Sequence, residues 1–199
     1  MLPSPHSVWN ANGSKSGPAE LTPERLTSPG RAPRPTRRTL LKWALFVAMM
    51  GVALTVDLVT KHLAEARLPE GELREVLPFL YLQRTANDGV AFGLLGGSTT
   101  LIIVANVIAL LVVTAYVFFD RRPILAGIAG GAIVGGSLGN MIQRLVGDGH
   151  VTDFLKFPHW PNFNAADVFI DAGLAAVVIG FIVEAATFWR ARKRKPASP

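Results

Sequence analysis

The chain has 199 residues, of which 50% are hydrophobic and 17% are charged, and its mean hydropathy is +0.35. This composition is too apolar for an ordinary soluble domain with one core, and it favours a membrane protein. The net charge of +6 is compatible with a nucleic-acid-binding protein, but the cations lie beside apolar runs, so no nucleic-acid partner is predicted. The absence of cysteine excludes disulfides, thiol redox chemistry and cysteine-ligated metal.

In chain order, residues 1–38 are rich in Pro, Ser, Gly and Arg and predict a disordered basic tail. Four apolar runs follow, each of about the 20 residues that a membrane-spanning helix needs. The predicted spans are residues 40–56 continued through 60, 99–119, 124–142 and 165–188. A second basic tail covers residues 190–199. The predicted organisation is therefore an α-helical membrane domain over residues 39–189 between two cytoplasmic tails.

The positions of the cations predict the orientation of the spans. The N-terminal tail, the turn at residues 120–123 and the C-terminal tail are all basic and lie on one side of a four-span topology. By the positive-inside rule this side is cytoplasmic, so both termini are expected on the cytoplasmic side of the membrane. The connections at residues 62–98 and 144–164 then face outward.

The first outward connection is too long for a bare turn. Residues 74–92 carry β-forming side chains and a turn signal at Asn87-Asp88-Gly89, which predicts a small hairpin or sheet at the membrane surface. Residues 62–68 are interpreted as a short interfacial helix. The second connection is interpreted as a short polar loop.

Four glycines in the third predicted span recur at every fourth residue: Gly127, Gly131, Gly135 and Gly139. They leave one face of the helix without side chains, so another helix can approach closely. We interpret this face as a packing surface without a catalytic role.

Ionisable residues near the ends of the spans are candidates for function, because a charge in the bilayer is costly. Asp57 and Lys61 are four residues apart on one helix face, so a structural ion pair and a functional role both remain open. Asn140 and Arg144 have the same spacing. The Arg144 side chain either extends to the lipid headgroups or contacts a phosphate or a carboxylate.

Asp153 and Asp167 flank the second outward loop. Taken singly, Asp153 is compatible with a solvated loop residue, and Asp167, three residues after Asn164, with a stabiliser of a helix N-terminus. If the two carboxylates meet at the lipid boundary, they must share a proton, because like charges at close range do not both ionise in a poorly solvated site. One would then act as a base and the other as an acid.

Five motifs occur in an order that resembles the bacterial lipoprotein signal peptidases, signal peptidase II: DLVTK (57–61), NDGVAF (87–92), GGSLGNMIQR (135–144), GHVTDF (149–154) and FNAAD (163–167). The resemblance implies a four-helix aspartic endopeptidase with a small outer sheet. It would remove signal peptides from diacylglyceryl-modified prolipoproteins, cutting before the lipidated cysteine, and its partners would be these substrates and membrane lipids.

The resemblance also implies roles for individual residues. The catalytic pair is expected at Asp153 and Asp167, on the outer face of the membrane, with no metal and no cofactor. Seven further positions are expected to bind substrate or support the site: Asp57, Lys61, Asn87, Gly89, Asn140, Arg144 and Asn164.

The chain departs from the family pattern at two positions. At position 143 a glutamine replaces the acid of the N-x-x-D-R motif, an acid expected to hold the arginine. Asp171 lies one helical turn deeper than Asp167, where it either adds a third carboxylate to the site or pairs with Arg144. These departures leave open altered specificity or a lapsed paralogue that binds precursors or lipid without cleavage. A small transporter is disfavoured, because apart from Glu184 no ionisable residue continues from the outer site across the bilayer.

Overall fold

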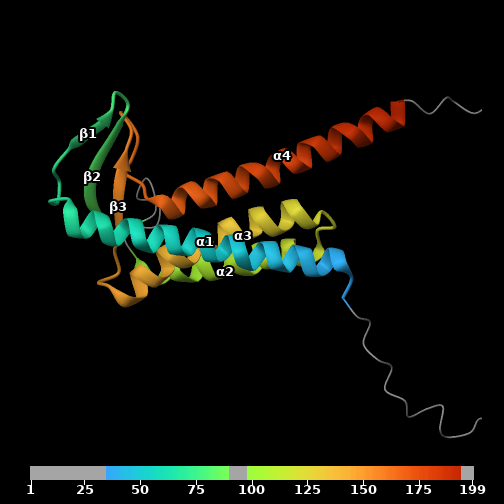
Figure 1. Ribbon diagram of the computed structural model, residues 1–199, viewed down its shortest axis with the longest axis horizontal. Coiled ribbons are helices and arrows are strands. Elements are labelled where there is room, and N and C mark those ends of the chain that lie inside the picture. The colour runs from blue at the N-terminus through green and yellow to red at the C-terminus, as the bar shows by residue number, and fades with distance from the viewer. Residues whose placement is uncertain (1–34, 90–97, 194–199) are drawn as a thin grey trace, which may run out of the picture. The chain divides into compact units, whose positions relative to one another are not determined.

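The computed structural model describes residues 35–89 and 98–193 (Figure 1). The elements in chain order are α1 (Arg37–Arg67), β1 (Arg74–Leu77), β2 (Leu80–Asn87), α2 (Thr99–Phe119), α3 (Pro123–Val146), β3 (Val151–Lys156) and α4 (Ala165–Lys193). All four helices are long and apolar enough to cross a membrane. The predicted fold class, four spanning helices with a small β-sheet, is confirmed. Most of the two predicted tails lies outside the described residues.

Helix α1 is longer than the predicted first span. Its first turn is capped by Thr36, whose hydroxyl accepts a hydrogen bond from the backbone N–H of Thr39. The helix then continues for 31 residues, or about 46 Å, which exceeds the ~30 Å hydrocarbon core. The separate interfacial helix expected at residues 62–68 was therefore wrong. This segment is the end of α1, because no proline occurs between Thr36 and Pro69 to end the helix earlier.

Helix α3 packs against α1, α2 and α4 and is the most buried of the four helices. Its glycines explain the close approach to α1. A Cβ atom on Gly127, Gly131 or Gly135 would lie 2.5–2.7 Å from backbone carbonyl oxygens of α1. The predicted packing surface is confirmed, and its last glycine, Gly139, lies against the side chain of Asp57.

The three strands form one antiparallel sheet in the order β1-β2-β3 (Figure 1). The predicted hairpin corresponds to β1 and β2, although residues 90–92 of the predicted segment lie outside the described residues. The interpretation of residues 144–164 as a loop was wrong, because they contain β3. The buried face of β3 carries Asp153 beside Val151, so the segment lacks the apolar alternation that predicts a strand.

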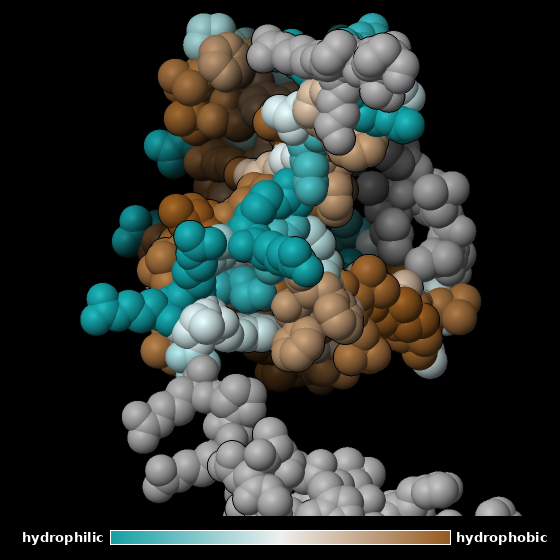
Figure 2. Space-filling view, turned by 90° about the vertical axis from the view of Figure 1, so that its right-hand side faces the viewer, coloured by the Kyte–Doolittle hydropathy of each residue, from teal (hydrophilic) through white to brown (hydrophobic). Residues whose placement is uncertain are grey.

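The end of the helices remote from the sheet is basic. There the Lys42 ammonium donates to the backbone carbonyls of Phe118 and Asp120 at 3.1 and 3.0 Å, and Arg122 lies 3.4 Å from Glu184. Helix α4 continues to Lys193, beyond the predicted end at residue 188. Figure 2 looks onto this end and shows hydrophilic side chains gathered between hydrophobic surfaces.

Candidate functional site

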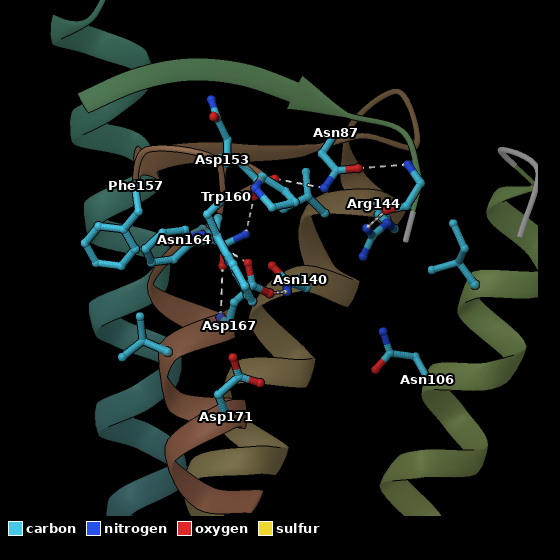
Figure 3. A pocket seen from close by; sticks show the side chains of 17 residues that line it. Asn87, Asn106, Asn140, Arg144, Asp153, Phe157, Trp160, Asn164, Asp167 and Asp171 are labelled. Atoms are coloured by element: carbon cyan, nitrogen blue, oxygen red, sulfur yellow. Dashed lines mark hydrogen bonds between the residues drawn. The ribbon is translucent and has the colours of Figure 1, made fainter. Parts of the chain in front are cut away.

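A cavity of about 640 Å³ lies between the sheet, helices α2, α3 and α4, and the segment that leads into α4 (Figure 3). Its walls bring together most of the site residues predicted from the sequence: Asn87, Gly89, Asn140, Arg144, Asp153, Asn164 and Asp167. Asp57 and Lys61 lie behind this wall. Four elements separated by up to 80 residues thus contribute polar groups to one cavity.

Asp153 lies on β3 and is 2% exposed. One carboxylate oxygen accepts a hydrogen bond from the side-chain amide of Asn164 at 2.6 Å, and the other accepts from that of Asn87 at 2.8 Å. Burial raises the pKa of the Asp153 carboxyl from 3.8 to about 6, and the negative charge of Asp167 adds to the rise. The two amide hydrogen bonds oppose the rise, because they favour the ionised form.

Asp167 lies in the first turn of α4. Its Oδ2 accepts from the backbone N–H of Asn164 at 3.0 Å, and its own backbone N–H donates to Oδ1 of Asn164 at 3.2 Å. This reciprocal arrangement caps the helix, so the N-terminal role considered for Asp167 is confirmed. The same carboxylate also accepts from the Asn140 amide at 3.0 Å, so capping and presentation to the cavity occur together.

Each of three asparagines is oriented by a donor that contacts its amide oxygen. Asn87 accepts from the backbone N–H of Gly89, Asn164 from that of Asp167, and Asn140 from the ammonium of Lys61. The NH₂ end of each amide must then face an aspartate: Asp153 for Asn87 and Asn164, and Asp167 for Asn140. Both carboxylates therefore lie in a shell of preoriented neutral donors (Figure 3).

Asp57 and Lys61 form an ion pair, one of the two alternatives that their spacing left open, with 2.7 Å between Oδ2 and Nζ. Both side chains are almost fully buried. The pair does more than stabilise α1, because Lys61 also donates to Asn140 at 2.6 Å and Asp57 accepts from the backbone N–H of Ala166 at 2.8 Å. It thus joins α1 to α3 and to the start of α4 directly behind the two cavity aspartates.

Arg144 does not extend to the lipid headgroups, since it is only 8% exposed. Its Nη2 donates to the backbone carbonyl of Gly89 at 3.2 Å, and within residues 35–89 and 98–193 its buried Nε has no hydrogen-bond partner. In the same part of the chain, no ion pair joins Arg144 to Asp171 or to the other cavity carboxylates. The guanidinium therefore presents a donor beside the aspartates.

The two departures from the family pattern differ in position. Asp171 lines the cavity one turn below Asp167 (Figure 3). Gln143 does not hold the arginine that follows it, because its side-chain amide contacts Glu65 and Thr152 instead.

Sequence reasoning missed several residues of the cavity wall: Asn106, Phe157, Trp160 and Asn162. A signal existed for Asn106, because it is an amide in the middle of an apolar span and faces the cavity from α2 (Figure 3). Asn162 gave no such signal. Its role is to join the loop before α4 to β2, by donating to the Gln83 carbonyl at 3.0 Å and the Thr85 hydroxyl at 3.1 Å.

Comparison with known proteins decides the family. The profile of the signal peptidase (SPase) II family matches residues 49–183, which include every cavity residue described above. The chain belongs to the signal peptidase II family. Similar members are the lipoprotein signal peptidases of Mesorhizobium japonicum, 37% identical over 152 residues, and Brucella ovis, 32% identical over 142 residues. These matches cover 71% and 68% of this chain and 87% of each relative.

Two solved structures described as bacterial membrane enzymes are similar in fold to this signal peptidase II family member. One is 24% identical, with a TM-score of 0.68, and the match covers 78% of this chain and 94% of the other. The second is 26% identical, with a TM-score of 0.63, and the match covers 69% and 92%. The four helices and the small sheet therefore form an architecture that other membrane enzymes share.

Proposed function

We propose that this protein is a membrane-embedded aspartic endopeptidase that removes signal peptides from diacylglyceryl-modified prolipoproteins, cutting before the lipidated cysteine. One observation carries the proposal. Asp153 and Asp167 come from a strand and a helix of separate segments, yet both carboxylates line one cavity and accept hydrogen bonds from the same residue, Asn164. Membership of the signal peptidase II family supports the reaction class.

The two carboxylates have different surroundings, which suggests a division of roles. Asp153 is the proposed acid, because burial raises its pKa to about 6 and favours the protonated form. With Asp153 as the acid, Asp167 is the proposed base; it lies in the first turn of α4 and lines the same cavity. The pair then starts the reaction with one shared proton.

In the proposed reaction, Asp167 takes a proton from a water molecule, and the resulting hydroxide attacks the carbonyl carbon before the lipidated cysteine. Asp153 donates its proton to the carbonyl oxygen as the tetrahedral intermediate forms. When the C–N bond breaks, Asp167 returns its proton to the leaving amine, and the re-forming carbonyl returns the other proton to Asp153. Both aspartates end in their starting states.

Arg144, Asn140 and Asn87 are proposed substrate-binding or supporting residues. The guanidinium of Arg144 has a buried Nε without a hydrogen-bond partner in the described part of the chain, and it lies in the wall of the cavity. A buried donor of this kind favours a substrate oxygen, such as a peptide carbonyl or an ester of the lipid. Asn140 and Asn87 keep the carboxylates in place.

We propose that the cavity faces the outer side of the bacterial cytoplasmic membrane and that both termini are cytoplasmic. Basic residues at the start of α1, in the α2–α3 turn and in the last turn of α4 gather at the end remote from the sheet. The positive-inside rule assigns such an end to the cytoplasm.

Cleavage of a lipidated precursor tests the proposal. Wild type in lipid vesicles should convert a synthetic diacylated prolipoprotein to a smaller product on a gel, and Asp153→Asn and Asp167→Asn should each reduce the rate by at least about 10³-fold. Asp148→Asn is the matched control, because Asp148 is an exposed acid outside the cavity, and it should cleave at the wild-type rate. Full activity in either cavity variant, or binding without cleavage by wild type, would refute the proposed peptidase.

A further inference from the structure

A second polar cluster lies outside the cavity and joins α1, α3 and β3. The Gln143 side-chain NH₂ donates to Glu65 Oε1 at 2.7 Å and to the Thr152 hydroxyl at 2.8 Å, and the Thr152 hydroxyl lies 2.6 Å from the same Glu65 oxygen. The Gln143 amide oxygen accepts from the backbone N–H of Thr152 at 2.9 Å. Three side chains from three elements thus meet at one point of the β3 backbone.

The position of this cluster matters because Thr152 directly precedes Asp153. Successive side chains of a strand point to opposite faces, so the cluster holds β3 from the side that Asp153 does not occupy. Within the described residues, the cavity walls do not include Glu65, Gln143 or Thr152. The cluster is therefore placed to act on Asp153 through the backbone and not by contact with a substrate.

Strand β3 is an edge strand of the sheet, and only one of its edges pairs with β2. On the other edge, the N–H of Thr152 donates to Gln143, and the N–H of Phe154 donates to the Phe163 carbonyl at 3.1 Å. The backbone is thereby bonded immediately before and immediately after Asp153. An edge strand without these partners would expose unpaired N–H groups and hold its side chains less firmly.

The chemistry of the cluster requires one amide and one acid. Gln143 accepts a hydrogen bond from the strand and donates two others, which a carboxylate cannot do. Glu65 accepts from both neighbours and supplies the only charge among the three side chains. Two carboxylates at residues 65 and 143 would repel each other unless they shared a proton.

We infer that Glu65 and Gln143 are a matched positioning pair that sets the backbone at Asp153, with the acid carried by α1 and the amide by α3. The inference rests on the proposed peptidase activity. It also explains why Gln143 is compatible with an intact site, because the Gln143 amide hydrogen-bonds to β3 while Glu65 supplies the acid of the pair.

An exchange of the two groups tests the pair. Gln143→Glu alone brings two carboxylates together, so kcat for the diacylated precursor should fall about tenfold at pH 8 while KM stays within about twofold. The loss should shrink at lower pH, as the carboxylate pair takes up a proton. Glu65→Gln with Gln143→Glu restores one acid and one amide and should return kcat to within about threefold of wild type.

Two further variants keep the test decisive if Gln143→Glu folds poorly. Thr152→Val keeps the backbone N–H but removes the hydroxyl, and it should lower kcat about threefold, whereas Thr152→Ser should match wild type. Glu72→Gln is the control, because Glu72 is an exposed acid outside the cluster. Melting temperatures of all variants distinguish a loss of kcat caused by displacement of Asp153 from a loss caused by general unfolding.

The outcomes distinguish the inference from the proposed function. If wild type cleaves but the exchanged double variant is no better than Gln143→Glu, the matched pair is refuted and the peptidase assignment stands. A change in KM in place of kcat would equally refute a positioning role. If wild type does not cleave the precursor, the positioning pair and the proposed peptidase activity are both refuted.

Discussion

The ammonium of Lys61 lies 2.6 Å from Oδ1 of Asn140, and this contact determines which end of the Asn140 amide faces Asp167. Since Oδ1 is occupied by Lys61, the NH₂ group is left to donate to the Asp167 carboxylate at 3.0 Å. A cation on α1 thus orients a group on α3 that holds a proposed catalytic residue on α4. Asp57, the ion-pair partner of Lys61, extends this series of contacts to the start of α4, because its carboxylate accepts a hydrogen bond from the backbone N–H of Ala166.

Removal of Lys61 should therefore have two separable effects. Lys61→Met leaves the fully buried Asp57 without its partner, and the free energy of unfolding should fall by about 3 kcal/mol. Asp57→Asn combined with Lys61→Met removes the unpaired charge and should recover most of this stability. Cleavage should stay below the wild-type rate in the double variant, because Asn140 is no longer oriented. Denaturant unfolding in detergent and precursor cleavage measure the two effects, and full activity in the double variant would contradict this role of Lys61.

The raised pKa of Asp153 should respond in opposite directions to changes at two neighbours. Asp167→Asn removes a negative charge that raises this pKa, so the pKa should fall below about 6. Asn87→Ala removes a hydrogen bond that lowers it, so the pKa should rise above about 6. Carbon-13 NMR of the aspartate carboxyl groups follows both titrations, with Asp153→Asn used to assign the signal. Shifts in the same direction would show that another contact controls the group.

The same pKa predicts how stability depends on pH. Because the folded-state value of about 6 exceeds 3.8, Asp153 contributes most to stability when it is protonated, below about pH 4, and the contribution is lost as the pH rises through about 6. Between pH 4 and pH 7 the free energy of unfolding of wild type should decline relative to Asp153→Asn, which does not titrate, by up to about 3 kcal/mol. Unfolding measured at each pH checks the sign. A constant difference would mean that Asp153 titrates normally.

The packing of α3 on α1 predicts a sharp contrast between two glycines. A Cβ atom on Gly135 would lie 2.5 Å from the Met50 carbonyl oxygen, so Gly135→Ala must push two backbones apart and should cost about 1–3 kcal/mol. Among the described residues, no atom lies within 4 Å of a Cβ added to Gly51. Gly51→Ala should therefore be neutral or gain up to about 1 kcal/mol from helix propensity. Equal melting temperatures for the two variants would exclude a tight contact at Gly135.

Replacing Gln143 with the aspartate of the family motif should not increase the rate of precursor cleavage. Asp is one methylene shorter than Gln, and its carboxylate would face Glu65 without any hydrogen to donate. Gln143→Asp is therefore expected to lower precursor cleavage about tenfold or more, through loss of both donated hydrogen bonds. The same assay tests the lapsed-paralogue alternative, which predicts the reverse: an inactive wild type and cleavage only in the Gln143→Asp variant.

The sequence by itself determined the features that depend on near neighbours in the chain. The four spans follow from apolar runs of sufficient length, the Asp57–Lys61 ion pair from a spacing of four residues, and the α3 packing surface from its repeated glycines. Each of these requires only the helical period and the cost of a polar group in lipid.

Only the tertiary structure decided which groups meet across elements. Strand β3 pairs with β2, which lies more than 60 residues earlier in the chain. The buried Asp153 interrupts the alternation of apolar residues that would have predicted β3 from the sequence. The orientation of the Asn140 amide depends on a donor from another helix, the ammonium of Lys61. The Gln143 side chain bonds to Glu65 and Thr152 and not to Arg144, because a half-buried amide is satisfied by whichever partners the fold brings near, and spacing along the chain does not specify them.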